Sequence, residues 1–531
     1  MNISASIRKL TLLFVALFIG LSAGLVYWQV VVAQQVTSNP HNSRRFLNSN
    51  APIRGKIYDR NGVLLADSQP APNGGYVRHY YDPSLAGLIG YYVPGFLPRG
   101  IEAQYDDYLS GRKGLTALDN TINKTLHRPP VGDNIYLTID ERIQKIVNQD
   151  YDTPIPIDNT LTFATDRGSV IVTDPHTGET LAMLSRPSFD PNQMIATLSA
   201  NDLSYYNKLA SDPKENALLE RPIRSTYIPG STYKTMTLVA GLDSGSTTLN
   251  TDFDKAHAIG PVTYNGHKIG PIGNNIDTYT FHFPVTTEYG FTHSDNVIYA
   301  QIGVKTGAQK WLDYNKRFYV GSQIPFDLPV QPSSVEGQPF EDVNLASGAF
   351  GQGYDAVTPM QMSVLDDAVA NDGQLMRPTL VGKILDPNKT QIEKYDPQAL
   401  GSAPQMSQQT AREVRQAMFG VVRCGSGSIY VSGVKLGTSP YNIIAKTGTA
   451  EVGGGLGANA WLITQAPYSA TDPTLLPKLT IVAMKENGGE GGNAVGPMVT
   501  NMYSDIFNNV MKTPVPPTPD PNYCFKTGLL Q

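Results

Sequence analysis

The segment NIIAKTGTAEV, residues 442–452, and the two apolar segments that follow it decide the fold. ANAWLITQAP spans 458–467 and KLTIVAMKEN spans 478–487, and each has the length and apolar content of a buried β-strand. Two further strands are predicted in GSVIVTDPHTGETLAMLS, residues 168–185, around an Asp-Pro-His-Thr-Gly turn. Helical patterns fill the chain between these groups. Strands at both ends with helices between them predict an α+β domain in which one antiparallel sheet is flanked by helices.

The N-terminal residues predict a membrane anchor. Two basic residues precede an uncharged stretch, 10–33, which would be roughly 36 Å long as a helix and long enough to span a bilayer. The basic residues place the N-terminus in the cytoplasm, and aromatic residues near the far end suit the membrane interface. We therefore expect a cytoplasmic tail over 1–9, a single transmembrane helix over 10–33, and the rest of the chain outside. A cleaved signal peptide is the alternative, although the apolar run exceeds a usual h-region.

A small pedestal domain is predicted after this helix, over residues 34–133. The segment APIRGKIYDRNGVLLADS, 51–68, alternates apolar residues around the turn Arg60-Asn61-Gly62, which predicts a hairpin. The residues that follow, to about 115, are rich in Tyr, Gly and Pro, so we expect irregular structure there. Residues 134–512 are assigned to the main catalytic domain. Residues 513–531 form a proline-rich tail, and we expect its segment KTPVPPTPDPNY, 512–523, to be extended or disordered.

Composition narrows the class of protein. The 531 residues suffice for two or three domains, and a net charge of -5 gives no sign of a nucleic-acid partner. The two cysteines, Cys424 and Cys524, are too few for a disulfide framework or a zinc cluster. They form either one bridge or two free thiols, and the sequence leaves both open. We expect neither a metal nor a cofactor.

The first candidate catalytic motif lies in IPGSTYKTMTLVAGL, residues 228–242. Pro229 and Gly230 interrupt the chain before a helical run, so Ser231 would begin the helix and Lys234 would follow one turn later. A serine hydroxyl is a weak nucleophile until a base removes its proton, and a lysine with a depressed pKa can be that base. Five Ser-x-x-Lys sequences occur in this chain, so chance occurrence is the alternative for any one of them.

The second candidate is Ser294-Asp295-Asn296, within THSDNVIYAQIG. The hydroxyl of Ser294 can relay a proton between a lysine and a leaving group, and Asn296 can hydrogen-bond both a lysine and a substrate amide. The alternative is a helix cap, which Ser and Asp commonly supply.

The third candidate is Lys446-Thr447-Gly448-Thr449 on the predicted strand 442–452. A strand that carries Lys and Thr can bind a substrate carboxylate, and Gly448 lets a substrate backbone approach closely. Lys-Thr-Gly recurs at 305–307 and 526–528, but without the strand.

These three motifs, in this order, resemble the signature of the penicillin-binding transpeptidases and serine β-lactamases. The resemblance implies their fold and assigns roles to the matching residues. Ser231 would be acylated, with Lys234 as its general base, while Ser294 and Asn296 would shuttle protons and position substrate. Lys446, Thr447 and Thr449 would hold a terminal carboxylate. The backbone amides of Ser231 and Thr449 would form the oxyanion hole.

Further segments look like class B penicillin-binding proteins of the compact, short-pedestal branch. They are RGKIYDRNGVLLA (54–66), GIEAQYDDYLSGRKGL (100–115), TDPHTGETLAMLSRPSFDPN (173–192) and GAFGQGYDAVTPMQM (348–362). This resemblance implies a peptidoglycan D,D-transpeptidase that acts on stem peptides in elongation or division and is covalently inhibited by β-lactams. By analogy its partner would be a polytopic membrane glycosyltransferase. Two departures are Asn459-Ala460-Trp461, where many relatives have His-Ala-Trp, and the unusual loop 424–439.

Other functions remain as alternatives. A D,D-carboxypeptidase or β-lactamase-type hydrolase would pass the acyl group to water, but no segment matches the extra carboxylate of class A β-lactamases. A non-catalytic β-lactam-binding sensor is the other alternative, although all catalytic positions are intact. Roughly 100 residues separate the predicted anchor from residue 134, which is too few for a second catalytic domain.

Overall fold

The structure is a computed structural model of the chain. It describes residues 3–27, 53–71, 74–113, 130–157, 160–162, 165–211, 215–259, 263–264, 267–268, 283–335, 342–425, 436–453 and 456–529.

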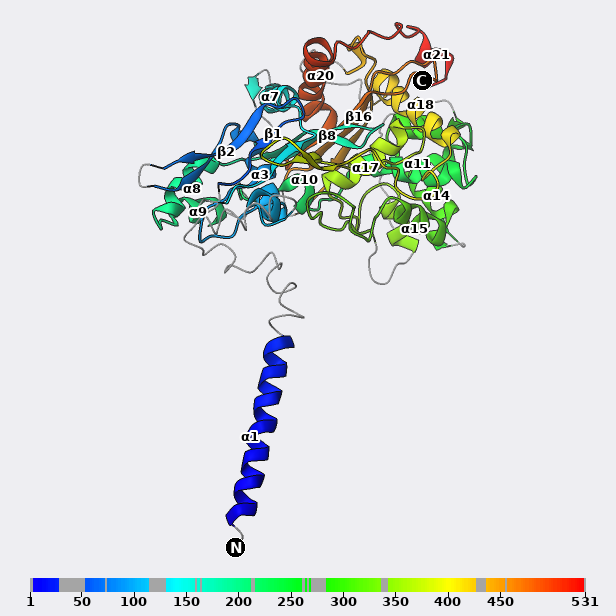
Figure 1. Ribbon diagram of the computed structural model, residues 1–531. Coiled ribbons are helices and arrows are strands. Elements are labelled where there is room, and N and C mark those ends of the chain that lie inside the picture. Colours follow the sequence, from blue (N-terminus) through cyan, green and yellow to red (C-terminus); the bar gives the residue numbers. More distant parts are fainter. Residues whose placement is uncertain are drawn as a thin grey trace.

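A five-stranded antiparallel sheet forms the centre of the main domain (Figure 1). Its order is β15 (Ile444–Ala450), β16 (Asn459–Ala466), β17 (Leu479–Lys485), β7 (Gly168–Asp174) and β8 (Glu179–Arg186). The five strands predicted from the sequence are therefore confirmed. The two groups of strands, far apart in the chain, join where β17 pairs with β7.

Helices cover both faces of this sheet, as the sequence predicted for an α+β fold. Alternate residues of a strand point to opposite faces. In β16, Trp461 and Ile463 pack into the larger core, whereas Ala460 and Leu462 pack into the smaller one. The larger core contains α11 (Lys234–Asp243), α14 (Asn296–Thr306), α17 (Pro359–Ala370) and α18 (Gln408–Cys424). The smaller core lies under α7 (Glu141–Asp150) and α20 (Gly496–Asp505).

A second, six-stranded sheet joins the pedestal to the main domain. Its order is β14 (Gln391–Lys394), β13 (Val381–Leu385), β4 (Asn134–Leu137), β1 (Ile57–Tyr58), β2 (Leu64–Pro70) and β3 (Tyr76–Tyr80). The predicted hairpin is confirmed, since β1 pairs antiparallel with β2. The carboxylate of Asp59 fixes its turn by accepting hydrogen bonds from the backbone amides of Asn61 (2.8 Å) and Val63 (2.7 Å). Gly62 supplies the positive φ of 86°.

The residues expected to be irregular contain short helices as well as β3. These helices are η3 (Pro83–Leu85), α3 (Ala86–Ile89), α4 (Gly100–Gln104) and α5 (Asp106–Leu109). They surround a buried ion cluster in which Arg54 contacts Glu102 at 2.7 Å and Asp106 at 2.5 Å. Arg78 contacts the other oxygen of Glu102 at 2.6 Å. Their apolar residues belong to the same core as the main domain, so the pedestal packs directly onto it.

The remaining elements are short. The helices are α8 (Pro191–Ser199), α9 (Ser204–Ser211), α10 (Arg221–Arg224), η4 (Gly230–Tyr233), α12 (Lys255–Ile259), α13 (Thr287–Thr292), α15 (Ala308–Arg317), α16 (Asp342–Gly348), η5 (Leu436–Thr438), α19 (Gly491–Ala494), η6 (Ile506–Met511) and α21 (Tyr523–Lys526). Three small antiparallel pairs are β5 (Ile155–Ile157) with β6 (Thr160–Thr162), β9 (Asp252–Phe253) with β12 (Val285–Thr286), and β10 (Thr263–Tyr264) with β11 (His267–Lys268).

Helix α1 (Ile3–Val26) covers part of the predicted anchor and stands apart from the rest of the chain (Figure 1). Large apolar side chains are exposed along it, among them Leu13, Phe14 and Phe18. Among the described residues, no helix combines the length and the hydropathy that a bilayer crossing requires. The last part of the predicted span, residues 28–33, lies outside the described residues.

The C-terminal tail folds back onto the main domain. Cys524, in α21, forms a disulfide with Cys424 at the end of α18, with the two Cα atoms 5.6 Å apart. The structure thus selects the bridge over two free thiols. Residues 512–520 contain no helix or strand, in line with the extended segment expected there, whereas the chain after them forms the short helix α21 and is held by the disulfide.

Candidate active site

Ser231 lies in the turn η4 that leads into α11, as the sequence predicted. Gly230 precedes it with a φ of 56°, a conformation that side chains disfavour. A Cβ on Gly230 would lie 2.7 Å from the carbonyl oxygen of Thr449. The amide of Gly230 also donates to the carbonyl of Gly351 at 2.9 Å. The absence of a side chain therefore lets the nucleophile turn pack onto the K-T-G strand β15.

Lys234 lies under Ser231 and is fully buried. Its Nζ lies 2.8 Å from Ser231 Oγ, 2.7 Å from the carbonyl oxygen of Ser294 and 2.7 Å from Asn296 Oδ1. The last two atoms can only accept, so they use two N–H groups of the lysine. When the amine is neutral, its lone pair remains for the hydroxyl proton of Ser231. The site therefore contains a base at hydrogen-bonding distance from the nucleophile.

Asn296 begins α14, and Ser294 lies immediately before the cap of that helix. Asp295 caps the helix, since its Oδ1 accepts from the amide of Ile298 at 2.9 Å. Ser294 has a φ of 62°, and its hydroxyl lies between the two lysines. The distances from Ser294 Oγ are 3.2 Å to Lys234 Nζ and 2.9 Å to Lys446 Nζ.

Lys446 on β15 points inward and is fully buried. Its Nζ donates to Ser294 Oγ and to its neighbouring carbonyl, that of Thr447, at 3.2 Å. The ring of Phe291, a residue that the sequence did not single out, lies 5.4 Å from this nitrogen. Thr449, by contrast, is exposed on the same strand. The charge of Lys446 thus lies within the lysine–serine cluster, while the side chain of Thr449 is exposed to solvent.

Gly448 lies in close contact with the nucleophile turn. A Cβ at this position would lie 2.9 Å from the carbonyl oxygen of Pro229 and 2.9 Å from Thr232 Cγ2. The absence of a side chain therefore lets the nucleophile turn approach β15 closely, and the approach of a substrate backbone at Gly448 stays a prediction.

Burial depresses the pKa of both lysines. Burial lowers the pKa of Lys234 well below its usual value, the nearby charge of Lys446 lowers it further, and Asp295 opposes the change. Burial lowers the pKa of Lys446 to about 7. Free amine is therefore accessible at neutral pH, as a lysine base requires.

Asn459, where the chain departs from the usual His-Ala-Trp, and Trp461, which the chain keeps, both form hydrogen bonds with neighbouring segments. Asn459 Oδ1 accepts from the amide of Asn487 at 3.0 Å, so this position keeps a polar role. The indole of Trp461 donates to the carbonyl of Ile228 at 3.0 Å, three residues before the nucleophile. In the described part of the chain, no group of three or more His, Cys, Asp or Glu side chains is arranged to hold a metal ion.

Known families match both parts of the molecule. Residues 168–512 match the penicillin-binding protein transpeptidase domain, and residues 54–135 match the penicillin-binding protein A dimerisation domain. The chain is 29% identical over 506 residues to peptidoglycan D,D-transpeptidase PbpA of Mycolicibacterium smegmatis, covering 93% of this chain and 96% of the relative. It is 28% identical to MrdA of Escherichia coli over 78% of this chain and 64% of that protein.

Solved structures agree with these matches. The ceftriaxone acyl-enzyme complex of penicillin-binding protein A from M. tuberculosis superimposes with a TM-score of 0.71 at 26% identity, covering 86% of this chain and 99% of that one. Its penicillin G acyl-enzyme complex gives a TM-score of 0.70. With most of its length matched by the transpeptidase domain and a pedestal before it, this chain belongs to the class B penicillin-binding proteins.

Proposed function

We propose that this protein is a peptidoglycan D,D-transpeptidase that cross-links stem peptides through an acyl-enzyme on Ser231. The observation that carries the proposal is the 2.8 Å contact between Ser231 Oγ and the buried Nζ of Lys234. A nucleophile beside a base of depressed pKa is the arrangement that serine acyl transfer requires.

In the proposed first half-reaction, Ser231 Oγ attacks the carbonyl carbon between the two D-Ala residues of a stem peptide. The hydroxyl proton passes to the neutral Nζ of Lys234 as the bond forms. Collapse of the tetrahedral intermediate breaks the peptide bond, and the departing D-Ala amine takes up a proton. Ser294 Oγ, within reach of both lysines, is the proposed relay for that proton.

The second half-reaction transfers the acyl group. An amine from a neighbouring stem peptide attacks the ester carbonyl and loses a proton to the same lysine–serine cluster. Ser231 regains its proton as the cross-link forms. The amide of Asn296 fixes the orientation of Lys234 throughout, since its Oδ1 accepts from Nζ at 2.7 Å.

We assign substrate binding to β15 and the nucleophile turn. β15 is the first strand in the order of its sheet, so its outer edge suits an extended peptide. Thr447 and Thr449 would hold the terminal carboxylate, with the inward charge of Lys446 adding attraction. The backbone amides of Ser231 and Thr449 would stabilise the oxyanion, and the packing of Gly230 against Thr449 keeps these backbones close.

The test of the serine chemistry is covalent labelling. Full-length protein incubated with a labelled penicillin should gain one adduct by intact mass, mapped by proteolysis to the peptide containing Ser231. Ser231→Ala should gain none. An undiminished adduct in Ser231→Ala would refute the assignment, and no adduct in the wild type would favour a protein that lacks this chemistry.

A second test separates transfer from hydrolysis. A stem-peptide donor ending in D-Ala-D-Ala, supplied with a peptide amine acceptor, should yield cross-linked product as well as free D-Ala. Free D-Ala with hydrolysed donor alone would favour the D,D-carboxypeptidase alternative.

We further propose that residues 10–33 anchor the protein as a single-pass helix, with the N-terminus in the cytoplasm and the catalytic domain outside. The uncharged sequence and the exposed apolar side chains of α1 support this. Protease added to cells with permeable outer layers should digest residues 168–510, and protection of that region would contradict the orientation. By analogy with class B penicillin-binding proteins, a polytopic membrane glycosyltransferase is the proposed partner.

A further inference from the structure

The C-terminal tail contacts both flanks of the active site. We infer that this tail, residues 513–529 with its bridge from Cys524 to Cys424, is a positioning element for the Ser294 loop and for β15. The inference rests on the proposed function, because it assigns the tail a part in the same acylation.

The tail first contacts the chain where β15 begins. The side-chain amide of Asn442, two residues before the strand, donates to the carbonyl of Pro517 and to that of Tyr468, both at 3.0 Å. Asn442 is mostly buried and has a φ of 49°. The tail thus accepts a hydrogen bond from the turn that leads directly into the K-T-G strand β15.

The tail is next joined to α18. Cys524 bonds to Cys424, and the neighbouring Tyr523 ring packs edge-on against Phe419 with centroids 4.8 Å apart. Helix α18 packs against both β15 and α13. At its end, a Cβ on Gly425 would lie 1.9 Å from the carbonyl oxygen of Thr292, so helix α18 and the end of α13 are in direct contact. The bridge therefore fixes the tail to a helix that touches both catalytic segments.

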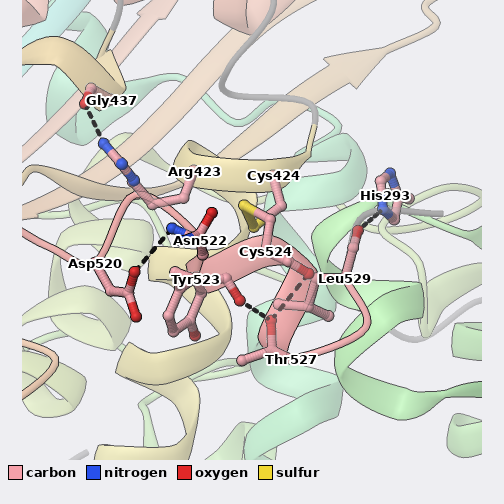
Figure 2. Close-up of a disulfide and its surroundings, with 10 residues drawn as sticks. All are labelled: His293, Arg423, Cys424, Gly437, Asp520, Asn522, Tyr523, Cys524, Thr527 and Leu529. Atoms are coloured by element: carbon pink, nitrogen blue, oxygen red, sulfur yellow. Dashed lines mark hydrogen bonds between the residues drawn. A yellow bond between two sulfur atoms is a disulfide. The ribbon is translucent and has the colours of Figure 1, made fainter.

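Leu529, the last described residue of the tail, lies beside His293 (Figure 2). The carbonyl oxygen of Leu529 accepts a hydrogen bond from His293 Nε2 at 2.8 Å, and Leu529 itself is 1% exposed. His293 immediately precedes Ser294, whose hydroxyl lies between Lys234 and Lys446. A shift of His293 is thereby transmitted to the serine that both lysines contact.

The bridge supports a tail that is buried only at separate points, such as Leu529, while its helix α21 lies largely exposed. Helix α21 has only four residues, and Phe525 within it is 83% exposed. Such a segment gains little from apolar burial to offset the entropy of ordering. A cross-link between residues 100 positions apart removes much of the conformational freedom of the unbridged chain. Reduction should therefore release the contacts of Leu529 and Pro517 before the core unfolds.

The experiment measures acylation by a fluorescent penicillin in the full-length protein, oxidised and reduced. Reduction, or the double variant Cys424→Ala/Cys524→Ala, should lower the second-order acylation rate constant about 10-fold, because small misplacements of catalytic groups are costly. Reductant added to the double variant is the matched control and should change nothing further. His293→Leu should show a similar loss, whereas His293→Gln, which keeps a side-chain donor, should recover most of the rate.

The pH profile separates positioning from simple stabilisation. Lys446 on β15 and Asp295 at the cap of α14 are the charged groups that face Lys234. If the loop shifts and admits water, the acid limb of the acylation profile should move to higher pH in the reduced protein. A lower melting temperature with an unchanged acylation rate constant and an unchanged pH midpoint would overturn this inference and leave the proposed function standing. No Ser231 adduct in the oxidised wild type would overturn the proposed function, and this inference with it.

Discussion

Lys446→Met removes the inward cation of β15 while keeping a side chain of similar length. Lys446 donates to Ser294 Oγ at 2.9 Å, and its charge is, after burial, the cause that lowers the pKa of Lys234. Without it, the pKa of Lys234 should rise, so less free amine is present at neutral pH. We expect acylation at pH 7 to fall about 100-fold, typical of losing one preorganised donor, and its acid limb to move to higher pH.

The same substitution should change how stability depends on pH. Burial lowers the pKa of Lys446 to about 7 in the folded protein, from 10.5 in the unfolded chain. The unfolded chain then binds more protons, so the folded state is penalised fully below pH 7 and recovers as the pH rises towards 10.5. This difference in pKa corresponds to on the order of 5 kcal/mol at most. The variant lacks the penalty, so its melting temperature should rise relative to that of the wild type as the pH falls from 10 to 6.

The assay combines acylation by a fluorescent penicillin with thermal unfolding at each pH. Lys305→Met is the matched control, because Lys305 belongs to another Lys-Thr-Gly sequence but is exposed on α14. It should leave the acid limb and the pH dependence of melting unchanged. If Lys446→Met also left both unchanged, the buried and mutually repelling lysine pair would not control the site.

Two other substitutions test the packing around the site and the pedestal. Gly230→Ala, at φ 56° and with its Cβ 2.7 Å from a carbonyl of β15, should lower acylation about 100-fold. Gly62 also has a positive φ, but a Cβ added there would meet nothing within 4 Å. An equal loss of acylation rate in Gly62→Ala would therefore contradict the role of close packing at Gly230. Arg54→Met should destabilise by about 3–5 kcal/mol, since it leaves the buried carboxylate of Glu102 short of a partner. The matched substitution Arg60→Met, at a half-exposed ion pair, should destabilise by less than about 1 kcal/mol in the same melting experiment. Equal destabilisation by the two substitutions would contradict the conclusion that burial makes the Arg54 ion pair the more important one.

The strands of the central sheet could be predicted from the sequence because their signal is local. Runs such as 168–174 and 479–485 are apolar at successive positions, as strands buried on both faces must be. The turn at Gly62 was likewise predictable, because a positive φ and the short side chain of Asp59 act within a few residues. The pairing of β4 with β13 was not, because it joins segments separated by most of the main domain.

The catalytic motifs were found by order and context, and their geometry came only from the fold. Ser231 and Lys234 lie one helical turn apart, so their proximity follows from local structure. The convergence of Ser294 and Lys446 on them depends on the packing of α14 and β15 around α11. That packing also gave Gly448 its contact with the nucleophile turn, which residue type alone could not indicate.

The sequence by itself determined the class of this protein: a strand-rich core interrupted by helices, with a serine, its lysine and two supporting motifs in order. The strands follow from local periodicity, and the class follows from the resemblance of the three ordered motifs to those of the penicillin-binding transpeptidases. Only the tertiary structure decided that Cys424 bonds to Cys524, that the tail reaches His293, and that both lysines are buried together. Such contacts join residues distant in the chain, and the depressed pKa values arise from the exclusion of water that only the folded core provides.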